Sequence, residues 1–318
     1  MTEVSPAART ALDALAADPT TATKLLFTGG IGSGKSTVLA TARDELRRAG
    51  VAVLTRVPQP NESVAAVVID DAHLLTDPEL DTLTALAADP DATLVLASEP
   101  REQATGLRRL SAAIEREHAR IALGPWPRAE VGRRLGITDS ETLDHVLLAT
   151  AGLPLLVDAV ATAGWSAAHI VRNAGAALSD RLRRLDEPAL STLLLMSLSP
   201  GLGPADIAAA LGVTAERAHT LVDRGYATGL LDTGYGSRFT AFVHDTAAAL
   251  TGAVRHREIE SALLRSQAET STLSMGLALT LAEHGLRDEL LAAVLTDHAQ
   301  RTTDPGQSAR MLRAAIEI

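Results

Sequence analysis

Residues 29–36 constrain the fold of this chain more than any other segment. They read Gly-Gly-Ile-Gly-Ser-Gly-Lys-Ser and match G-x-x-x-x-G-K-[ST] at every fixed position. The glycines permit backbone conformations that a Cβ would forbid, so successive peptide N–H groups can point into one concave nest. A helix that begins at Ser36 would add the positive end of its dipole to that nest. The sequence therefore predicts a loop that binds the phosphates of a nucleotide.

Two side chains of this loop are expected to carry its chemistry. Lys35 would reach the β- and γ-phosphates, and the Ser36 hydroxyl would ligate Mg²⁺. The alternative is a glycine-rich turn that happens to hold a lysine, but an apolar strand precedes the loop and a helix follows it, as the motif requires. The predicted nucleotide-binding set is Gly29, Gly30, Ile31, Gly32, Ser33, Gly34, Lys35, Ser36 and Thr37.

A second motif begins at residue 67, where Val-Val-Ile-Asp-Asp forms an apolar strand that ends in paired acids. Asp70 is expected to hold Mg²⁺ through water, because this ion prefers oxygen ligands and sheds its waters reluctantly. Asp71 is placed to orient or deprotonate the attacking water, and capping of the next helix is the alternative. Ser98 ends another strand and is predicted to touch the γ-phosphate or the water, although a serine there is commonplace.

Strand-like and helix-like patterns alternate over the first 125 residues, as in a parallel α/β sheet. We expect strands at 24–28, 51–57, 65–69, 93–97 and 120–123, with helices at 36–48, 78–88 and 101–118. The fourth of these strands is the extra one that some phosphate-loop proteins insert between the strands of the two motifs. Beyond residue 126 the periodicity is helical, including separate helices at 180–187 and 188–198, except for a β-hairpin expected at 229–240.

These patterns predict an α/β P-loop NTPase fold with further helical domains. The expected domains are a nucleotide-binding domain at 1–125, a helical lid at 126–178, a winged-helix-like domain at 179–255 and a helical segment at 256–318. The final helix, at 308–318, has no Gly, Asn or Pro to end it. We therefore expect the helical segment to be the start of a longer helical region.

Composition excludes several classes of protein. Among the 318 residues there is no cysteine, which excludes disulfides, thiol nucleophiles and Cys-ligated zinc. No uncharged apolar run reaches the roughly 18 residues of a membrane span, and no secretory signal is present, so we expect a cytoplasmic protein without membrane contact. The net charge of −10 opposes non-specific binding of nucleic acid. Histidines other than His244 show no H-E-x-x-H spacing and are expected to be surface or core residues.

Three segments besides the phosphate loop resemble one known family. They are Ile-Asp-Asp-Ala-His-Leu-Leu at 69–75, Ala-Gly-Leu-Pro-Leu at 151–155 and Phe-Val-His-Asp at 242–245. Together they resemble the STAND-type signal-transduction NTPases, above all the ATPase module of large LuxR-type and maltose-activator-type bacterial regulators. The resemblance covers most of residues 20–260.

The resemblance implies a P-loop domain, a lid and a winged helix clamped around ADP. Exchange to ATP, aided by a small-molecule or protein inducer, would open the clamp and permit self-association. By position, Pro154 would pack near the adenine or ribose, and His244 would approach the β-phosphate. The alternatives are a helix-start proline and a core or surface histidine. In the family an arginine often follows the fourth strand directly, whereas here Glu99 and Pro100 intervene before Arg101. Arg101, Arg108 and Arg109 therefore all stay open as the arginine sensor or finger.

The predicted function is an ATP/ADP-binding switch module of a transcriptional regulator, with slow Mg²⁺-dependent hydrolysis. One alternative is an AAA-type remodelling ATPase with fast turnover. The other is a DNA-binding winged-helix protein with an ATPase domain, because residues 205–223 have the sequence pattern of a helix-turn-helix. In the second helix, however, the negative charges of Glu216 and Asp223 offset the positive charges of Arg217 and Arg224. The helix therefore offers little net positive charge to DNA phosphates. We therefore expect this helix pair to pack internally and any DNA contact to lie in a domain beyond Ile318.

Overall fold

The computed structural model describes residues 5–59, 62, 64–101, 104–116, 119–161, 166–231, 234 and 236–318. The predicted helix ends at 118 and 162, and residues 232, 233 and 235 of the predicted hairpin, lie outside these ranges. The chain forms two compact units. Unit 1 comprises Met1–Ala177 and Tyr226–Phe239, and unit 2 comprises Leu178–Gly225 and Thr240–Ile318.

Unit 1 is built on a five-stranded sheet with the order β2-β3-β4-β1-β5, in which all pairings are parallel. β4 pairs with both β1 and β3. The extra strand predicted between the strands of the two motifs is therefore confirmed. The strands are β1 Lys24–Thr28, β2 Val53–Leu54, β3 Ala66–Ile69, β4 Thr93–Ser98 and β5 Ile121–Ala122.

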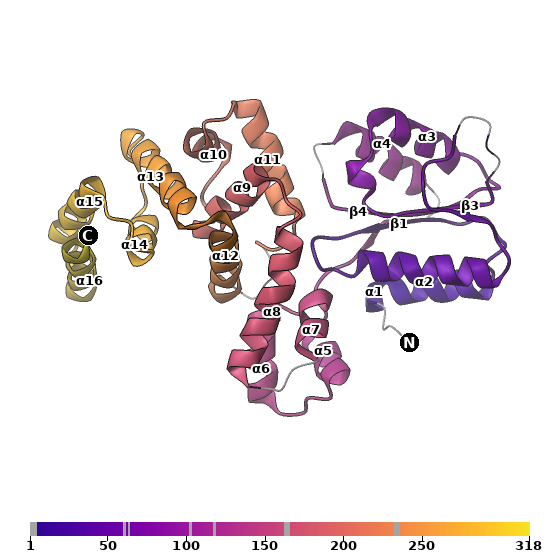
Figure 1. Cartoon of the computed structure of the whole chain (residues 1–318), viewed down its shortest axis with the longest axis horizontal. Helices are drawn as coiled ribbons and strands as arrows, with labels where there is room; N and C mark the ends of the chain where they lie inside the picture. Colours follow the sequence, from indigo (N-terminus) through magenta and orange to yellow (C-terminus); the bar gives the residue numbers. More distant parts are fainter. Residues whose placement is uncertain are drawn as a thin grey trace. The chain divides into compact units, whose positions relative to one another are not determined.

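Helices cover both faces of this sheet (Figure 1). Because successive strand residues point to opposite faces, Leu25 and Phe27 join the core beneath α1 and α2, while Leu26 joins the core beneath α3 and α4. Strands β1, β3 and β4 are buried along their whole length, and their interior residues are apolar because both faces are covered. The helices are α1 Pro6–Ala17, α2 Lys35–Arg48, α3 Asp77–Ala87 and α4 Thr105–Ile114, with the short 3₁₀ helix η1 Ala72–Leu74 after β3. Unit 1 thus has the α/β P-loop NTPase fold.

Three short helices and the start of a longer one follow the sheet in unit 1. They are α5 Arg128–Leu135, α6 Ser140–Thr150, α7 Pro154–Ala161 and α8 Ala167–Leu182, whose last residues belong to unit 2. The Asp139 carboxylate caps α6 by accepting from the Thr142 N–H at 2.7 Å. Arg134 of α5 donates to Asp158 of α7 at 3.0 Å, which ties these two helices together.

All the regular secondary structure described in unit 2 is helical. Its helices are α9 Glu187–Leu198, α10 Pro204–Leu211, α11 Ala215–Ala227, α12 Ser237–Thr251, α13 Ala253–Glu269, α14 Met275–Glu283, α15 Glu289–Arg301 and α16 Pro305–Glu317. The last residues of α11, from Tyr226, and the first residues of α12, up to Phe239, belong to unit 1. Across the described ranges of both units, the helices lack the combined length and apolarity that a membrane crossing needs.

The separate helix predicted at 180–187 is wrong. Instead α8 continues to Leu182, and Asp186 is the N-cap of α9, where its carboxylate accepts from the Ala189 N–H at 2.9 Å. An N-cap aspartate followed by a proline in the first turn is a strong start signal. That signal places the break at Asp186 rather than after Glu187.

The hairpin predicted at 229–240 is also wrong in its second arm. Arg238, Phe239 and Thr240 lie in α12, which begins at Ser237. Phe239, Val243 and Ala247 are all fully buried, and their four-residue spacing is that of one helix face. This helical periodicity outweighs the short alternation from which a strand was predicted. The predicted helix pair before it is present, with Gly212 at φ 64° in the turn between α10 and α11.

Candidate functional site

The loop between β1 and α2 adopts a conformation that requires glycine. Gly32 has φ 75° and Gly34, the N-cap of α2, has φ 92°, both in the left-handed region. A Cβ on Gly29 would lie 2.5 Å from Ser33 Oγ and 2.6 Å from the Leu123 carbonyl oxygen. The glycine pattern from which the phosphate nest was predicted is therefore dictated by this backbone.

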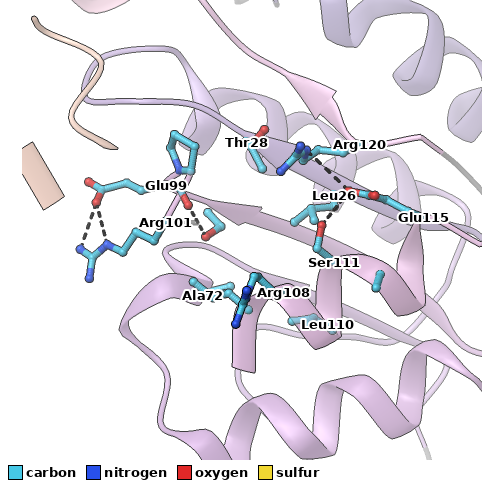
Figure 2. A pocket seen from close by; sticks show the side chains of 14 residues that line it. Leu26, Thr28, Ala72, Glu99, Arg101, Arg108, Leu110, Ser111, Glu115 and Arg120 are labelled. Carbon is cyan, nitrogen blue, oxygen red and sulfur yellow. Dashed lines mark hydrogen bonds and ion pairs between the residues drawn. The ribbon is translucent and has the colours of Figure 1, made fainter. Parts of the chain in front are cut away.

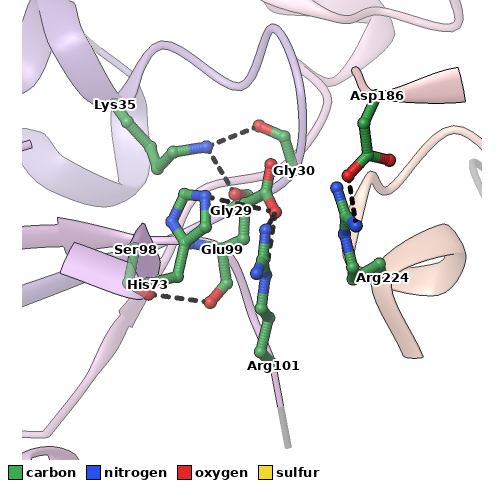
Figure 3. Close-up of polar contacts among 9 residues, drawn as sticks. All are labelled: Gly29, Gly30, Lys35, His73, Ser98, Glu99, Arg101, Asp186 and Arg224. Carbon is green, nitrogen blue, oxygen red and sulfur yellow. Dashed lines mark hydrogen bonds and ion pairs between the residues drawn. The ribbon is translucent and has the colours of Figure 1, made fainter. Parts of the chain in front are cut away.

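Lys35 lies at the first turn of α2 and folds back over the loop (Figure 3). Its ammonium Nζ donates to the carbonyl oxygens of Gly29 at 2.6 Å and Gly30 at 2.8 Å, and the side chain is almost wholly buried. Two neutral acceptors thus hold a positive charge at the mouth of the loop. A phosphate group in the loop would meet that charge directly.

Ser36 and Asp70 come from separate motifs and meet at the loop. The Ser36 hydroxyl donates to Asp70 Oδ2 at 2.6 Å, and Asp70 Oδ1 accepts from the Asp71 N–H at 2.8 Å. The two predicted magnesium ligands are therefore neighbours, although 34 positions separate them in the chain. A hydroxyl and a carboxylate oxygen at this spacing are the hard donors that Mg²⁺ prefers.

The residues of the loop fit a magnesium-bound nucleotide. The Ser33 hydroxyl is buried and has no hydrogen-bond partner within the described part of the chain. At Gly29 and Gly30 a Cβ would lie within 2.6 Å of other protein atoms, so the loop can follow this path only with glycine at these positions. An unpaired buried hydroxyl, a glycine-rich loop and a hydroxyl–carboxylate pair together suit an anionic ligand and its cation.

Asp71 follows Asp70 with an unusual backbone conformation. Its φ of 50° is left-handed, which for a residue other than glycine costs about 1–3 kcal/mol. It stands at the N-cap of η1, yet its exposed side chain makes no capping hydrogen bond. The Asp71 side chain therefore does not cap η1.

Ser98 is the last residue of β4 and lies next to the phosphate loop. It pairs with Thr28 in the sheet register, and its carbonyl oxygen accepts from the Gly29 N–H at 3.1 Å. Its own hydroxyl donates to the Glu99 carbonyl oxygen at 2.9 Å (Figure 3). The residue is thus placed as predicted at the strand end, with its hydroxyl turned to the backbone.

A polar cluster missed by sequence reasoning lies at the carboxyl ends of β3 and β4 (Figure 3). Glu99 Oε2 accepts from Arg101 at 3.0 Å and lies 3.4 Å from His73 Nε2. The Glu99 N–H donates to His73 Nδ1 at 3.2 Å. The only signal in the sequence was the place of His73 two residues after the paired acids. Arg101, one sensor candidate, is therefore paired with a carboxylate.

The other two arginine candidates also have partners in unit 1. Arg109 pairs with Asp81 at 2.8 Å, and Arg108 donates to the Thr105 hydroxyl at 3.3 Å. Both of these contacts are exposed. None of the three arginines is singled out as a sensor by these contacts.

The segment around Pro154 packs directly on the phosphate loop. The Leu155 N–H donates to the Gly32 carbonyl oxygen at 3.1 Å, and a Cβ on Gly34 would lie 3.9 Å from the Pro154 Cβ. Pro154 is buried and is also the first residue of α7. The helix-start role and a place beside the loop are therefore compatible, because the start of α7 is itself at the loop.

The same loop also forms a backbone hydrogen bond with a segment that is distant in the sequence. The Ile31 N–H donates to the Thr228 carbonyl oxygen at 2.7 Å, and a Cβ on Gly30 would lie only 2.1 Å from that oxygen. Thr228 lies in Tyr226–Phe239, the part of unit 1 that is flanked on both sides by unit 2. The sequence could not predict this contact, because every residue has a backbone carbonyl oxygen and nothing marks the one at Thr228.

His244 has its partners in unit 2. Its side chain is buried, and Nδ1 lies 3.0 Å from Ser197 Oγ and 3.3 Å from the Leu194 carbonyl oxygen. Burial lowers the pKa of His244 to about 4, with the nearby His284 and His256 acting in the same direction. The predicted approach to the β-phosphate gains no support from this placement, since the imidazole is enclosed among residues of its own unit.

A cavity of about 420 Å³ lies on the α4 side of the sheet (Figure 2). Thr28 and Ser98 line it together with Arg101, Arg108 and Arg120. No residue of 29–36 is among its lining residues. The cavity is therefore a neighbour of the phosphate loop rather than the phosphate site, and the chemistry described above lies at the loop.

Comparison with solved structures finds a likeness to the RuvB Holliday junction branch migration motor of Thermotoga maritima. Identity is 17% over 70% of this chain and 85% of that chain, with a TM-score of 0.43. Two single-substitution variants of that protein also match at 17% identity, with TM-scores of 0.42 and 0.40. No protein-family model and no curated protein matches the chain. The strand order and the phosphate loop define the fold class without these likenesses.

Proposed function

We propose that this chain is a nucleotide-dependent switch that binds ATP or ADP with Mg²⁺ at residues 29–36 and hydrolyses ATP slowly. The observation that carries the proposal is the meeting of Lys35, Ser36 and Asp70 at one glycine-lined loop. Positive charge, peptide dipoles and hard oxygen ligands are what a polyphosphate and its metal ion need. ATP and ADP are favoured over other nucleotides by the resemblance to STAND-type NTPases.

In the proposed reaction, water attacks the γ-phosphorus and the bond to the β–γ bridging oxygen breaks, which leaves ADP and inorganic phosphate. Asp71 orients the water and takes up its proton. Lys35 and the loop N–H groups stabilise the charge that develops on the phosphate oxygens. Mg²⁺, when bound at Ser36 and Asp70, neutralises part of the same charge.

The contact between Ile31 and Thr228 supports a switch rather than a simple hydrolase. Residues 226–239 pack in unit 1, while both ends of this segment continue into helices of unit 2. A ligand moves such an equilibrium only if it binds the two arrangements with different affinity. We propose that nucleotide binding at the loop changes the strength of the hydrogen bond between Ile31 and Thr228. The mobility of α11 and α12, on either side of this segment in the chain, would change with it.

Within this proposal, the chain acts as the ATPase module of a STAND-type regulator. The proposed domains are 1–125, 126–178, 179–255 and 256–318, with an inducer and nucleotide-dependent self-association. The packing of Pro154 and Leu155 on the loop supports the proposed place of Pro154 at the nucleotide. His244 is not included in the nucleotide site, because its contacts lie in unit 2.

Duplex binding by this chain is the less favoured alternative. On α11 the exposed Glu216 offsets the exposed Arg217. Arg224 is mostly buried and donates to Asp186 at 2.9 Å (Figure 3), so it is engaged within unit 2. A surface of this kind offers little positive charge to phosphodiester groups.

The proposal is tested by identifying what the purified protein holds. The protein is denatured, and the released small molecules are separated by chromatography against ATP, ADP, GTP and GDP standards. We expect an adenine nucleotide, and slow phosphate release from added ATP that stops when EDTA removes Mg²⁺. Failure of labelled ATP and labelled ADP to bind at millimolar concentration would overturn the proposal.

Two further measurements separate the alternatives. Salt-sensitive duplex binding in a gel-shift assay with the whole chain would favour the DNA-binding alternative. Fast turnover that rises steeply with protein concentration would favour a remodelling ATPase. We expect neither result.

Gly30→Ala is expected to break the Thr228 contact. The new Cβ would meet the Thr228 carbonyl oxygen at 2.1 Å, so one of the two backbones must move and the Ile31 hydrogen bond is lost. Hydrogen exchange measured by mass spectrometry should quicken in peptides that cover Ile31 and residues 226–231. Loss of one buried hydrogen bond should also cost about 1–3 kcal/mol of unfolding free energy.

Gly124→Ala is the matched control for this substitution. A Cβ on Gly124 would have open space within 4 Å, and the φ of Gly124 is not left-handed, so the same chemical change should be neutral there. Equal exchange at Ile31 in the Gly30→Ala variant and the wild type would show that the Thr228 contact does not hold the loop.

A further inference from the structure

Three histidines and one glutamate converge in unit 2, away from the residues of the phosphate loop in the chain. His244 lies on α12, His256 and Glu260 lie on α13, and His284 is the C-cap of α14. Each offers one ring nitrogen or carboxylate oxygen, and these four atoms all lie within 4.8 Å of one another. The donors are therefore grouped on the scale of one metal coordination sphere.

His244 has a ring nitrogen without a partner. Nδ1 lies 3.0 Å from Ser197 Oγ and 3.3 Å from the Leu194 carbonyl oxygen. The Ser197 hydroxyl already donates to that carbonyl oxygen, so we assign the proton to Nδ1, where it can be donated to either oxygen. Nε2 then has a lone pair, and this buried atom has no hydrogen-bond partner in the part of the chain that the structure describes. A buried acceptor left unsatisfied costs about 1–3 kcal/mol. The carbonyl contact at Nδ1 is the arrangement that typically orients a metal-binding histidine.

Glu260 supplies a negative charge in the same place. It is 1% exposed, and its Oε1 lies 3.0 Å from His256 Nε2 and 2.7 Å from His284 Nδ1. Burial alone would raise the pKa of Glu260, but the contacts with His256 and His284 outweigh burial and lower it. The buried carboxylate is thereby kept ionised next to the imidazoles.

Hydrogen bonding alone accounts for only part of this cluster. Among the described residues, neither His244 Nε2 nor His256 Nε2 has a hydrogen-bond partner, although His256 Nε2 lies 3.0 Å from Glu260 Oε1. The His244 and His284 rings stack with centroids 4.4 Å apart, and positive charge on His284 disfavours protonation of His244. A divalent cation among the four groups would satisfy the His244 nitrogen and the carboxylate together.

We propose that His244, His256, Glu260 and His284 form a binding site for a divalent transition-metal ion, with Zn²⁺ the ion that best suits the donor set. Three imidazole nitrogens and one carboxylate oxygen are all typical zinc ligands. Because the protein supplies four donors, the site has the number of protein ligands of a structural zinc centre, whereas a catalytic centre keeps one position open. Small rotations of the side chains would bring the four atoms to coordination distance.

The position of the donors gives the ion a structural consequence. They come from α12, α13 and the end of α14, so the ion would join three successive helices of unit 2. Metal binding should therefore stabilise this unit against unfolding, since the unfolded chain has no assembled site.

The first experiment uses the full chain after treatment with a chelator. Zn²⁺ is titrated in competition with a chromophoric chelator, and Co²⁺ is titrated as a spectroscopic probe. We expect one ion per chain with sub-micromolar affinity, and intense visible bands typical of four-coordinate Co²⁺. Zn²⁺ affinity weaker than about 100 µM, or a weak six-coordinate Co²⁺ spectrum, would overturn the proposal.

The second experiment assigns the ligands. His256→Gln and His284→Gln are chosen because both side chains are partly exposed, 16% and 24%, so the fold should tolerate them. Each should weaken Zn²⁺ binding at least about 100-fold, because loss of even an outer-shell partner costs 10–100-fold. Glu260→Gln should act in the same direction.

His219→Gln is the matched control. His219 is exposed on α11, and its Nδ1 lies 2.7 Å from the Ala215 carbonyl oxygen of the same helix. This variant should bind Zn²⁺ as the wild type does. If Zn²⁺ binds equally well to the His256→Gln and His284→Gln variants, the ion lies elsewhere and the proposal fails.

Discussion

Lys35→Ala abolishes the stabilisation of this chain by nucleotide. For the wild type, Mg²⁺–ATP at about 100 times its dissociation constant should add about 2.7 kcal/mol to the free energy of unfolding. The variant should gain close to nothing at the same concentration. The reason is that the Lys35 ammonium is the side-chain cation bonded to the loop carbonyls of Gly29 and Gly30, where the phosphates would bind.

The measurement is thermal unfolding with and without nucleotide, with each protein compared to its own ligand-free form. That comparison is needed because the lysine also supports the empty loop through its two carbonyl contacts. Lys35→Met serves as a second variant, since it keeps the buried methylene stem and removes only the charge.

Arg48→Ala is the control for loss of one positive charge. Arg48 lies at the other end of α2, where its side chain is 67% exposed and pairs with Glu45. This variant should keep the full nucleotide-dependent shift. If Lys35→Ala and the wild type show the same shift, the loop does not bind the nucleotide through this lysine.

The sheet could be predicted from the sequence because its signals are local. β1 was expected at 24–28 and spans Lys24–Thr28, since an apolar run buried on both faces ends at the first loop glycine. One part of the strand order was also predicted, the place of β4 between β1 and β3, because some phosphate-loop proteins insert a strand there. The places of β2 and β5 were not predicted. Asp70 and Ser36 could be paired in advance because one magnesium ion needs both oxygens.

Features set by tertiary contact could not be predicted. The Thr228 carbonyl oxygen reaches Ile31 through the fold, and every residue type has such an oxygen, so the sequence does not single it out. The histidine cluster shows only the four-residue spacing of His256 and Glu260, which is also the spacing of an ordinary surface pair on a helix. The convergence of His244 and His284 on that pair depends on the tertiary arrangement of α12, α13 and α14.

Helix α12 shows why local alternation misled the prediction. Residues 229–240 contain glycines at 229, 234 and 236, which suggested a turn between two short strands. The buried series that begins at Phe239 continues through Val243 and Ala247, beyond the window in which the hairpin was sought. A longer window would have given the helical period.

Asp71→Asn should lower the rate of ATP hydrolysis by about 10²–10⁴-fold, the range of a general base. The affinity for Mg²⁺–ATP should stay within about threefold of the wild type, because the proposed metal ligands are Ser36 and Asp70. Phosphate release is measured under saturating ATP, and affinity is measured separately by titration.

The substitution removes the negative charge of the carboxylate and should leave the backbone conformation unchanged. Asp71 has φ 50°, and asparagine tolerates this left-handed conformation as well as aspartate does, so the loop after β3 should keep its shape. Asp44→Asn, at an exposed position of α2, makes the same charge change away from the loop and should hydrolyse ATP as the wild type does. If Asp71→Asn also releases phosphate at the wild-type rate, the residue does not act on the water, and its left-handed backbone serves only to turn the chain from β3 into η1.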